Sequence, residues 1–404
     1  MSASVPSSPE RIEVPGAVVD VVDRPGDVAS LAALLAERHA KSEGVLVVGG
    51  RTRLAQANRA GRLAAALSLE GLAGIDVFEP DEGVVHARAG TPVRALREAV
   101  AAEGWELPLD PPGAATTVGG TIASASVGPR AQVFGRVADA VLGLELVGAD
   151  GTPTKCGGRV VKNVTGYDMA KLYTGSFGSL AVVTGAWLRL RPQPAKRVVL
   201  AGRLARDPAT FEAARLAARA TTVRAFVWNE AADEADTAEL VVELGGGEAA
   251  VAQDRDALLR TFALAPADPL AVDRVRDARA HAATTAPLGL RARVVATRLE
   301  PLRRTVLDAG CAVSIDLGIG VVTARGGAAG ADGAARSDAR TLLGLREQAL
   351  ASGGALRFDW LPAALAGEVD VFGEEAGTRA LVVSLKQRFD PHRILNPGRF
   401  VAGT

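Results

Sequence analysis

Several residue types are scarce in this sequence, and each shortage excludes a class of function. Phe, Trp and Tyr make up 4% of the 404 residues, too few for the aromatic platforms on which proteins stack nucleic-acid bases. The 46 basic residues are balanced by 46 acidic ones, which argues against nucleic acid or an anionic membrane as a partner. The two cysteines, Cys156 and Cys311, have no metal-type spacing and fit reduced thiols. An iron–sulfur cluster needs about four cysteine ligands, so these residues cannot hold one.

Long apolar runs are absent as well. No stretch approaches the roughly 20 apolar residues of a membrane-spanning helix. The first residues, MSASVPSSPERIEVPG, lack the pattern of a secretory signal and predict a flexible N-terminus over 1–14. We expect a cytoplasmic protein, either free or held at the inner face of a membrane by partner subunits. The length of 404 residues predicts two or three domains, and 48% hydrophobic residues indicate a globular chain.

A glycine pair follows the first apolar strand of the sequence. Asp27 can cap a helix, and a strand is expected at Val45–Val48. Backbone N–H groups at glycine can approach an anion closely, and Arg and Thr add donors. Neither GxGxxG nor GxxxxGK[ST] occurs here, so a phosphate-binding loop and a plain turn both stay open. The residues concerned are Gly49, Gly50, Arg51 and Thr52.

A second glycine-rich segment, Leu107–Pro129, is built almost wholly from small residues. Its Val118 and Ile122 indicate an ordered, packed turn, the alternative being a flexible linker. Small residues let the main chain lie flat against a large planar or phosphorylated ligand. The residues that follow, 140–156, predict a β-hairpin that turns at Asp150-Gly151.

The stretch Lys155–Gly185 departs from the composition of the rest of the chain. It holds both tyrosines, Tyr167 and Tyr173, and three of the six lysines. We expect Lys162 to pair with Asp168 and Tyr167 to cap a helix over 168–173, so that these side chains shape a loop. The alternative is that they contact a substrate directly.

The sequence after Pro194 alternates strands and helices in two similar β-α-β-β-α units. Two such units form one antiparallel sheet with helices on one face. This half of the chain is therefore expected to be a separate α+β domain.

Four motifs in register resemble a known family. GGRT, PPGAATTVGGTIA, VLGLELVGADG and GGRVVKNVTGYDMAKLYTGSFGSLAVVT are similar to the FAD-binding domain of the PCMH-type (vanillyl-alcohol-oxidase) flavoproteins, and the tail RFDPHRILNPGRF resembles the family's DP…NPGR ending. Within that family, the chain most closely resembles the FAD-binding subunits of glycolate oxidases and dehydrogenases. The resemblance implies an α+β fold: a two-lobed FAD-binding domain over 15–194, an antiparallel-sheet cap domain over 195–380, and a tail over 381–404 that returns to the FAD domain.

The resemblance also implies which residues hold FAD. The GGRT loop would cradle the pyrophosphate, the second glycine-rich segment would form the other wall, and main chain near Gly178 would meet the pyrimidine edge of the flavin. The first two loops contain no His or Cys for a covalent link, so FAD is expected to bind non-covalently. The implied residues are Gly49, Gly50, Arg51, Thr52, Pro112, Thr117, Gly119, Gly120, Ser124, Gly128, Gly178, Val182, Val183 and Arg399.

One motif of the larger relatives is missing. The 2-hydroxyacid dehydrogenases that this chain resembles carry HxxGDGNxH, which binds a metal and positions a base. The four histidines here, His39, His86, His281 and His392, lie far apart in sequence, so no histidine-cluster metal site is expected. His392, Lys162 and Tyr167 are the candidates for a catalytic group, although a lone histidine is more often a surface residue.

Three functions follow from these observations. The first is an FAD subunit of a glycolate or D-lactate dehydrogenase complex, working beside a catalytic flavoprotein subunit and an iron–sulfur subunit that receives the electrons. The second is a self-sufficient FAD-dependent oxidoreductase of a small alcohol or hydroxyacid. The third is a flavin-stabilised structural subunit without catalysis of its own.

Overall fold

The computed structural model describes residues 7–159, 167–231, 236–281, 286–326 and 339–404. Internal contacts divide the chain into two compact units. The first comprises Met1–Val127, Gly135–Gln193 and Glu374–Thr404, and the second comprises Gly128–Phe134 and Pro194–Gly373. The domain limits predicted at 195 and 381 stay predictions. No described helix has the length and apolarity needed to cross a membrane.

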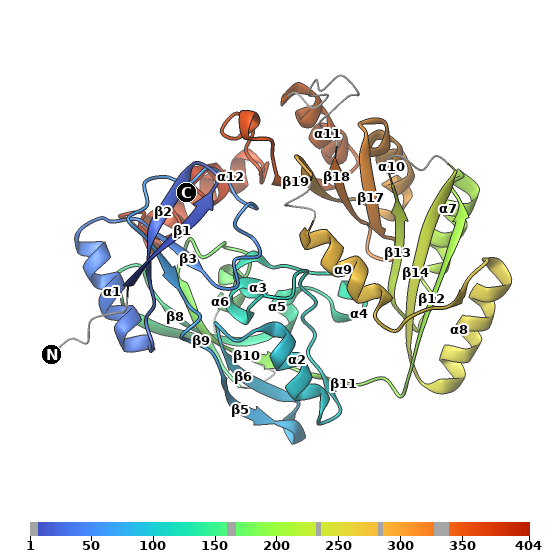
Figure 1. Cartoon of the computed structure of the whole chain (residues 1–404), viewed down its shortest axis with the longest axis horizontal. Coiled ribbons are helices and arrows are strands. Elements are labelled where there is room, and N and C mark those ends of the chain that lie inside the picture. Colours follow the sequence, from blue (N-terminus) through green and yellow to red (C-terminus); the bar gives the residue numbers. More distant parts are fainter. Residues whose placement is uncertain (1–6, 160–166, 232–235, 282–285, 327–338) are drawn as a thin grey trace. The chain divides into compact units, whose positions relative to one another are not determined.

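The first unit begins with a four-stranded sheet of order β1-β2-β4-β3. Figure 1 labels its strands β1, β2 and β3. β1 and β2 are antiparallel, whereas β4 runs parallel to both β2 and β3. Helix α1 starts at Asp27, whose carboxylate accepts from the Ser30 amide at 2.7 Å, so the predicted cap is confirmed. The elements are β1 (Ser7–Val14), β2 (Ala17–Asp23), α1 (Val28–Ala40), β3 (Val45–Val48) and β4 (Ala65–Ser68).

A five-stranded antiparallel sheet, β5-β6-β10-β8-β9, carries the main core of this unit. The predicted hairpin is confirmed as β8 and β9, paired from Val147↔Pro153 to Gly143↔Gly157. β10 lies in the middle of the sheet, and both of its faces are buried from Val182 to Ala186, so its side chains do not alternate between buried and exposed there. The elements are β5 (Ile75–Glu79), β6 (Val84–Arg88), α2 (Val93–Ala101), β7 (Trp105–Glu106), α3 (Val118–Ser124), α5 (Val137–Ala140), β8 (Val141–Val147), β9 (Pro153–Gly157), α6 (Met169–Tyr173), β10 (Val182–Arg189), β11 (Arg191–Pro192) and the C-terminal α12 (Ala376–Phe389).

The predicted packed turn at Leu107–Pro129 is in part a helix, α3. Thr117 caps it by accepting from the Gly120 amide at 3.2 Å. Val118 and Ile122, four residues apart, are both fully buried, as expected for one face of a helix. The two glycines of α3 lower its helix propensity. Packing of Val118 and Ile122 in the core outweighs that cost.

The second unit is built on one eight-stranded antiparallel sheet, which confirms the predicted joining of the two β-α-β-β-α units. Its order is β15-β12-β14-β13-β17-β18-β16-β19. The elements are α4 (Ala131–Phe134), β12 (Lys196–Ala205), α7 (Pro208–Ala217), β13 (Val223–Glu230), β14 (Thr237–Gly246), α8 (Glu248–Thr261), β15 (Ala265–Pro266), α9 (Ala271–His281), β16 (Gly289–Arg293), α10 (Leu299–Asp308), β17 (Cys311–Asp316), β18 (Val321–Gly326), α11 (Ala339–Ala351) and β19 (Ala355–Trp360).

Helices lie on both faces of this sheet, which corrects the expectation of one covered face. Phe211 of α7 packs edge-on against Trp228 of β13, with the ring centroids 5.4 Å apart. Helix α9 packs on the opposite face, where its Ala271 and Val272 join a small core with Val241 of β14. The sequence of α9, AVDRVRDARAH, is so rich in charge that its pattern did not indicate a packed helix.

Candidate functional site

The GGRT loop starts where β3 ends and packs tightly against the segment before α3. A Cβ on Gly50 would lie 1.6 Å from the Ala115 carbonyl oxygen, and one on Gly49 would lie 2.4 Å from Thr117 Oγ1. Neither position can hold a larger residue without moving its neighbours. Arg51 takes the left-handed conformation, with φ of 57°, which is uncommon outside glycine. The two glycines are therefore required for the close packing of two protein segments, whether or not a ligand is bound.

Arg53 ties these two segments together. Its guanidinium donates to the Pro112 carbonyl at 3.0 Å and to Ser126 Oγ at 2.6 Å. Thr52 Oγ1 lies 3.2 Å from Thr116 Oγ1 across the same boundary. The loop after β3 and the segment around α3 thus form two fixed walls.

Asn396, in the C-terminal NPGR motif, builds the third wall. Its side-chain oxygen accepts from the Val47 amide at 2.8 Å, and its side-chain nitrogen donates to the Phe177 carbonyl at 2.8 Å. Phe177, Gly178 and Asn396 all have positive φ, of 54°, 65° and 46°. Left-handed backbone at non-glycine residues is concentrated at binding sites, because the surrounding structure must hold it in place.

Two hollows open between these walls, both within the first unit. The larger has a volume of about 90 Å³ and the smaller about 60 Å³, so each matches a part of a dinucleotide and not the whole molecule. The implied FAD residues that line the larger are Gly49, Gly50, Arg51, Thr52, Thr117, Gly120, Ser124 and Arg399. Those that line the smaller are Gly49, Gly119, Gly120, Gly178, Val182 and Val183.

Arg399 gives the larger hollow a buried positive charge. Its side chain is 5% exposed, and burial lowers the pKa of its guanidinium to about 10. One nitrogen donates to the Leu54 carbonyl at 2.7 Å, whereas Nη1 is buried and has no hydrogen-bond partner. Arg51, on the same hollow, pairs with Glu10 of β1, which lowers the pKa of that carboxyl. A buried guanidinium with an unused donor suits an anionic group such as a pyrophosphate.

Some sequence-predicted residues lie elsewhere. Pro112 lines neither hollow, although its carbonyl binds Arg53. Gly128 falls in the second unit. Lys162 lies outside the described residues, so its predicted pairing with Asp168 stays a prediction.

The other two catalytic candidates, Tyr167 and His392, line neither hollow. The Tyr167 side chain is 93% exposed and precedes α6, whose N-cap is Asp168 and not Tyr167. Asp168 pairs with Lys171 at 2.8 Å. His392 stacks on His39, with the ring centroids 4.2 Å apart, and neither hollow includes it.

Three residues that shape the larger hollow were not predicted from the sequence: Arg53, Phe177 and Asn396. Arg53 follows GGRT directly, and Asn396 belongs to the NPGR motif, so their position beside recognised motifs was the available signal. Phe177 gave none, because its contribution is a backbone carbonyl and a left-handed φ.

Comparison with known proteins agrees with this geometry. Residues 19–157 match the family described as FAD binding domain, so this part of the chain is an FAD-binding domain and its cofactor is FAD. The glycolate oxidase subunit GlcE of Escherichia coli (strain K12) is 33% identical over 187 residues, 46% of this chain and 51% of that protein. The D-lactate dehydrogenase of Archaeoglobus fulgidus is 36% identical over 181 residues, 45% of this chain and 41% of that protein. The chain thus spans about half or less of the length of these relatives.

A solved structure extends the comparison to the whole fold. Alkyldihydroxyacetonephosphate synthase superposes with a TM-score of 0.68, covering 94% of this chain and 76% of that one. Its sequence identity is 14%, so the likeness concerns the fold alone. The predicted α+β architecture, an FAD-binding domain with an antiparallel-sheet domain, is confirmed.

Replacing Arg399 with Gln is expected to raise the dissociation constant for FAD by about 10- to 100-fold, since a hydrogen bond to a charged group contributes about 1.5–3 kcal/mol. The flavin-free protein should not lose stability, because the substitution removes a buried charge. Fluorescence titration with FAD and urea unfolding of the apoprotein measure the two effects. Arg94→Gln, an exposed position on α2, is the control. Equal affinity in Arg399→Gln and the control would place the pyrophosphate elsewhere.

Replacing Gly178 with Val is expected to abolish retention of FAD through purification. A Cβ there would lie 2.9 Å from Asn396 Nδ2, and φ of 65° is strained for a β-branched residue.

Gly119→Val should also abolish retention of FAD, for a different reason. Its Cβ would lie 2.7 Å from Ala89 Cβ, so it forces α3 away from the core rather than blocking the ligand. Gly247→Val, at an open position in the second unit, is the control for flavin content. Normal flavin in both variants would contradict the assigned walls.

Proposed function

We propose that this chain is the FAD-binding subunit of a glycolate or D-lactate dehydrogenase complex that oxidises a 2-hydroxyacid to the 2-oxoacid. The observation that carries the proposal is the pair of hollows between the three walls, called the FAD groove below, with Arg399 lining the larger hollow. These hollows lie in a domain whose relatives are a glycolate oxidase subunit and a D-lactate dehydrogenase. The bound FAD supplies the acceptor for two electrons from the hydroxyl-bearing carbon.

The residues of this chain have defined tasks in that proposal. Arg399 and Arg51 would contribute positive charge beside the pyrophosphate. Backbone at Gly178–Val183 lines the smaller hollow, where its N–H groups would stabilise negative charge on the flavin ring. The absence of His and Cys from the first two loops supports a non-covalent cofactor.

Electron transfer beyond the flavin calls for a partner. Cys156 belongs to the first unit and Cys311 to the second, and burial raises the pKa of the Cys311 thiol to about 11, so neither resembles a cluster ligand. An iron–sulfur subunit would supply that centre. A third relative, the glycolate oxidase subunit GlcD of Bacillus subtilis, is 41% identical over 105 residues, 26% of this chain and 22% of that protein. The names of these two glycolate oxidase subunits support a complex of several subunits.

A self-sufficient oxidoreductase is the second candidate. The observation that favours it is a cavity of about 450 Å³ in the second unit, lined by polar and apolar side chains, which gives this chain room for a substrate of its own.

Anaerobic reduction of the flavin distinguishes these functions. The chain is purified alone with FAD, and also from its native cell with the subunits that accompany it; each sample is mixed with glycolate or D-lactate, and the visible flavin band is recorded. Bleaching in the complex but not in the lone chain is the expected result. Bleaching of the lone chain supports the self-sufficient enzyme, and a flavin that stays oxidised while the complex turns over supports a structural role. A chain that takes up no FAD would overturn all three.

A further inference from the structure

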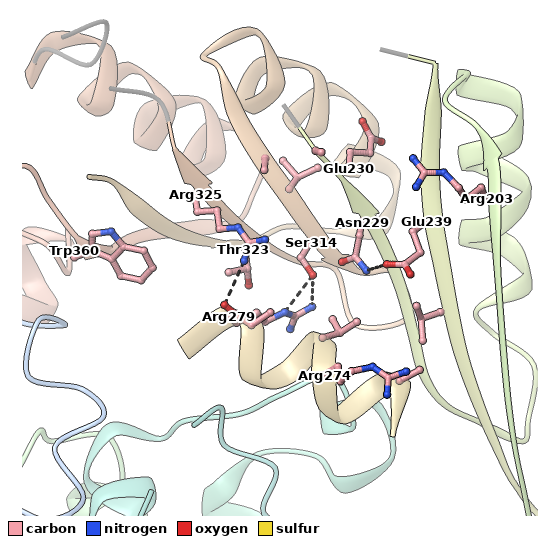
Figure 2. Close-up of a pocket in the computed structure, with 17 residues that line it drawn as sticks. Arg203, Asn229, Glu230, Glu239, Arg274, Arg279, Ser314, Thr323, Arg325 and Trp360 are labelled. Atoms are coloured by element: carbon pink, nitrogen blue, oxygen red, sulfur yellow. Dashed lines mark hydrogen bonds between the residues drawn. The ribbon is translucent and has the colours of Figure 1, made fainter. Parts of the chain in front are cut away.

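The cavity of about 450 Å³ lies between helix α9 and the sheet face that α9 covers (Figure 2). All of its lining residues belong to the second unit, and most lie on the sheet strands β12, β13, β14, β17, β18 and β19 or on α9. It is therefore distinct from the two hollows of the FAD-binding unit.

Most charged groups on this cavity are already neutralised. Arg279 of α9 makes two 2.8 Å hydrogen bonds with the Asp316 carboxylate, and Arg274 pairs with Asp268 at 2.6 Å. The carboxylate of Glu230 is engaged by Arg303 at 2.6 Å.

Glu239 and Arg203 lie on the sheet side of the cavity. They stand opposite each other on β14 and β12, and the Glu239 carboxylate accepts from the side-chain nitrogen of Asn229 at 3.1 Å. This part of the cavity is therefore close to neutral.

Arg325 is the exception. Its side chain is exposed on β18, and Nη1 donates to the Ala278 carbonyl at 3.3 Å. Among the residues that the structure describes, no carboxylate pairs with it. Thr323, two residues earlier on the same face, stands opposite Ser314 in the sheet register, so two hydroxyls lie on the sheet face that carries this guanidinium (Figure 2). Ser314 Oγ accepts from the Arg279 guanidinium at 2.9 Å, which leaves its own hydroxyl hydrogen for a ligand. A cation with adjacent hydroxyl donors is a recognition site for a carboxylate.

The rest of the cavity is apolar. Val241, Val275 and Ala312 line it, and the Trp360 ring stands at one margin (Figure 2). A glycolate ion has five heavy atoms and occupies at most about 150 Å³ if each takes the volume of a water molecule, about 30 Å³. The cavity therefore has space for a carbon chain beyond the two carbons of glycolate.

We propose that this cavity binds a carboxylate with an aliphatic side chain, its carboxylate on Arg325, Thr323 and Ser314 and its chain against Val241 and Val275. The inference rests on the proposed function at one point, because it identifies this ligand with the 2-hydroxyacid substrate. Longer 2-hydroxyacids then bind more tightly than glycolate.

Equilibrium binding to the FAD-loaded chain tests this without turnover. Glycolate, D-lactate and D-2-hydroxyvalerate are titrated, with Trp360 fluorescence and calorimetry as the readouts. Affinity is expected to rise about fourfold per added carbon, from about 0.8 kcal/mol per buried CH₂. Arg325→Gln is expected to weaken all three acids at least about tenfold and to leave FAD affinity unchanged. Arg219→Gln, an exposed arginine of the same unit outside the cavity, should change nothing.

Two further variants keep the test decisive. Thr323→Val removes one hydroxyl and is expected to weaken binding about five- to tenfold, whether or not Arg325→Gln folds. Trp360→Phe should remove the fluorescence response but keep the calorimetric one. Glycolate binding as tightly as D-2-hydroxyvalerate, or Thr323→Val binding like the unchanged protein, would overturn the proposal. Because binding to the chain and flavin reduction in the complex are measured separately, acids that bind the chain but reduce no flavin in the complex would leave this site standing and count against the proposed function instead.

Discussion

Replacing Lys386 with Met is expected to lower the free energy of unfolding by about 3–5 kcal/mol, because it leaves a buried carboxylate without its cation. Lys386 and Asp390 are both fully buried, one helical turn apart, with Nζ 2.8 Å from the carboxylate. The ammonium also donates to the carbonyls of Ser179 at 2.8 Å and Leu395 at 2.7 Å. Burial lowers the pKa of Lys386 even though Asp390 acts to raise it, so desolvation is the larger effect.

The same substitution should weaken FAD binding. Ser179 follows Gly178 and Leu395 precedes Asn396, and both of those neighbours line the smaller hollow. Lys386 therefore positions both segments of the third wall without lining either hollow. Urea unfolding of the apoprotein and titration with FAD should both respond, whereas a purely local role would change stability alone.

Lys41→Met is the matched control. Lys41 pairs with Glu37 at the same i,i+4 spacing, but both side chains are exposed, so its loss should leave the urea concentration at the unfolding midpoint nearly unchanged. The double variant Lys386→Met/Asp390→Asn removes the unpaired charge and should recover part of the loss, because the amide oxygen can still accept from one of the two backbone amides, Ile394 or Leu395, that the two Asp390 oxygens now bind. If Lys386→Met unfolds at the same urea concentration as Lys41→Met, the buried pair does not stabilise this unit.

The position of Lys386 shows what the sequence could not reveal. Within ALVVSLKQRF a lysine is the expected surface residue of a helix, and the carbonyls that surround it come from a turn some 200 residues earlier and from the following tail. Only the folded contact makes it a buried residue. The glycine loops, in contrast, were predictable. Where two backbone segments approach too closely for a Cβ, the sequence must have glycine, and these glycines occur in motifs that follow one another in a recognised order.

The cavity beneath α9 is a similar case. Arg279 is one of many arginines in a charged helix, yet it is buried because Asp316 of β17 receives it. Strand register and the placement of α9 decide which arginines, like Arg325, have no carboxylate partner among the described residues. Neither is fixed by local sequence pattern. Motif order was enough to predict the FAD-binding unit, but the chemistry of the second unit required the structure.

Replacing Glu243 with Gln is expected to lower the free energy of unfolding by about 3–5 kcal/mol, since it removes the fully buried anion at the centre of a cluster of arginines. The Glu243 carboxylate accepts from Arg130 at 2.7 Å, from Arg197 at 2.8 Å and from Arg224 at 2.9 Å. Arg130 also pairs with Asp273 at 2.9 Å. Within the part of the chain that the structure describes, the network fastens Gly128–Phe134, which directly follows the α3 wall of the FAD groove in sequence, into the second unit.

The effect of Glu243→Gln should depend on pH in a defined direction. Burial acts to raise the pKa of Glu243, but the arginines, Arg130 first, outweigh it and the pKa lies below its usual 4.5. A carboxyl with a lowered folded-state pKa stabilises the protein above its unfolded-state pKa, and this contribution is lost as the pH falls through the folded-state value. The stability difference between the two proteins should therefore be constant above about pH 5 and shrink below about pH 4.5.

Urea unfolding between pH 3.5 and 7, followed by a probe in the second unit such as Trp228, measures this difference. Asp139→Asn is the control, because Asp139 pairs with Arg136 on the exposed surface and its loss should cost about 0–1 kcal/mol. A loss for Glu243→Gln no greater than that of the control would show that the three arginines do not depend on Glu243. A larger loss of stability that does not shrink below pH 4.5 would assign the effect to packing instead of charge. The anchoring of Gly128–Phe134 would then not depend on ionisation of the Glu243 carboxyl.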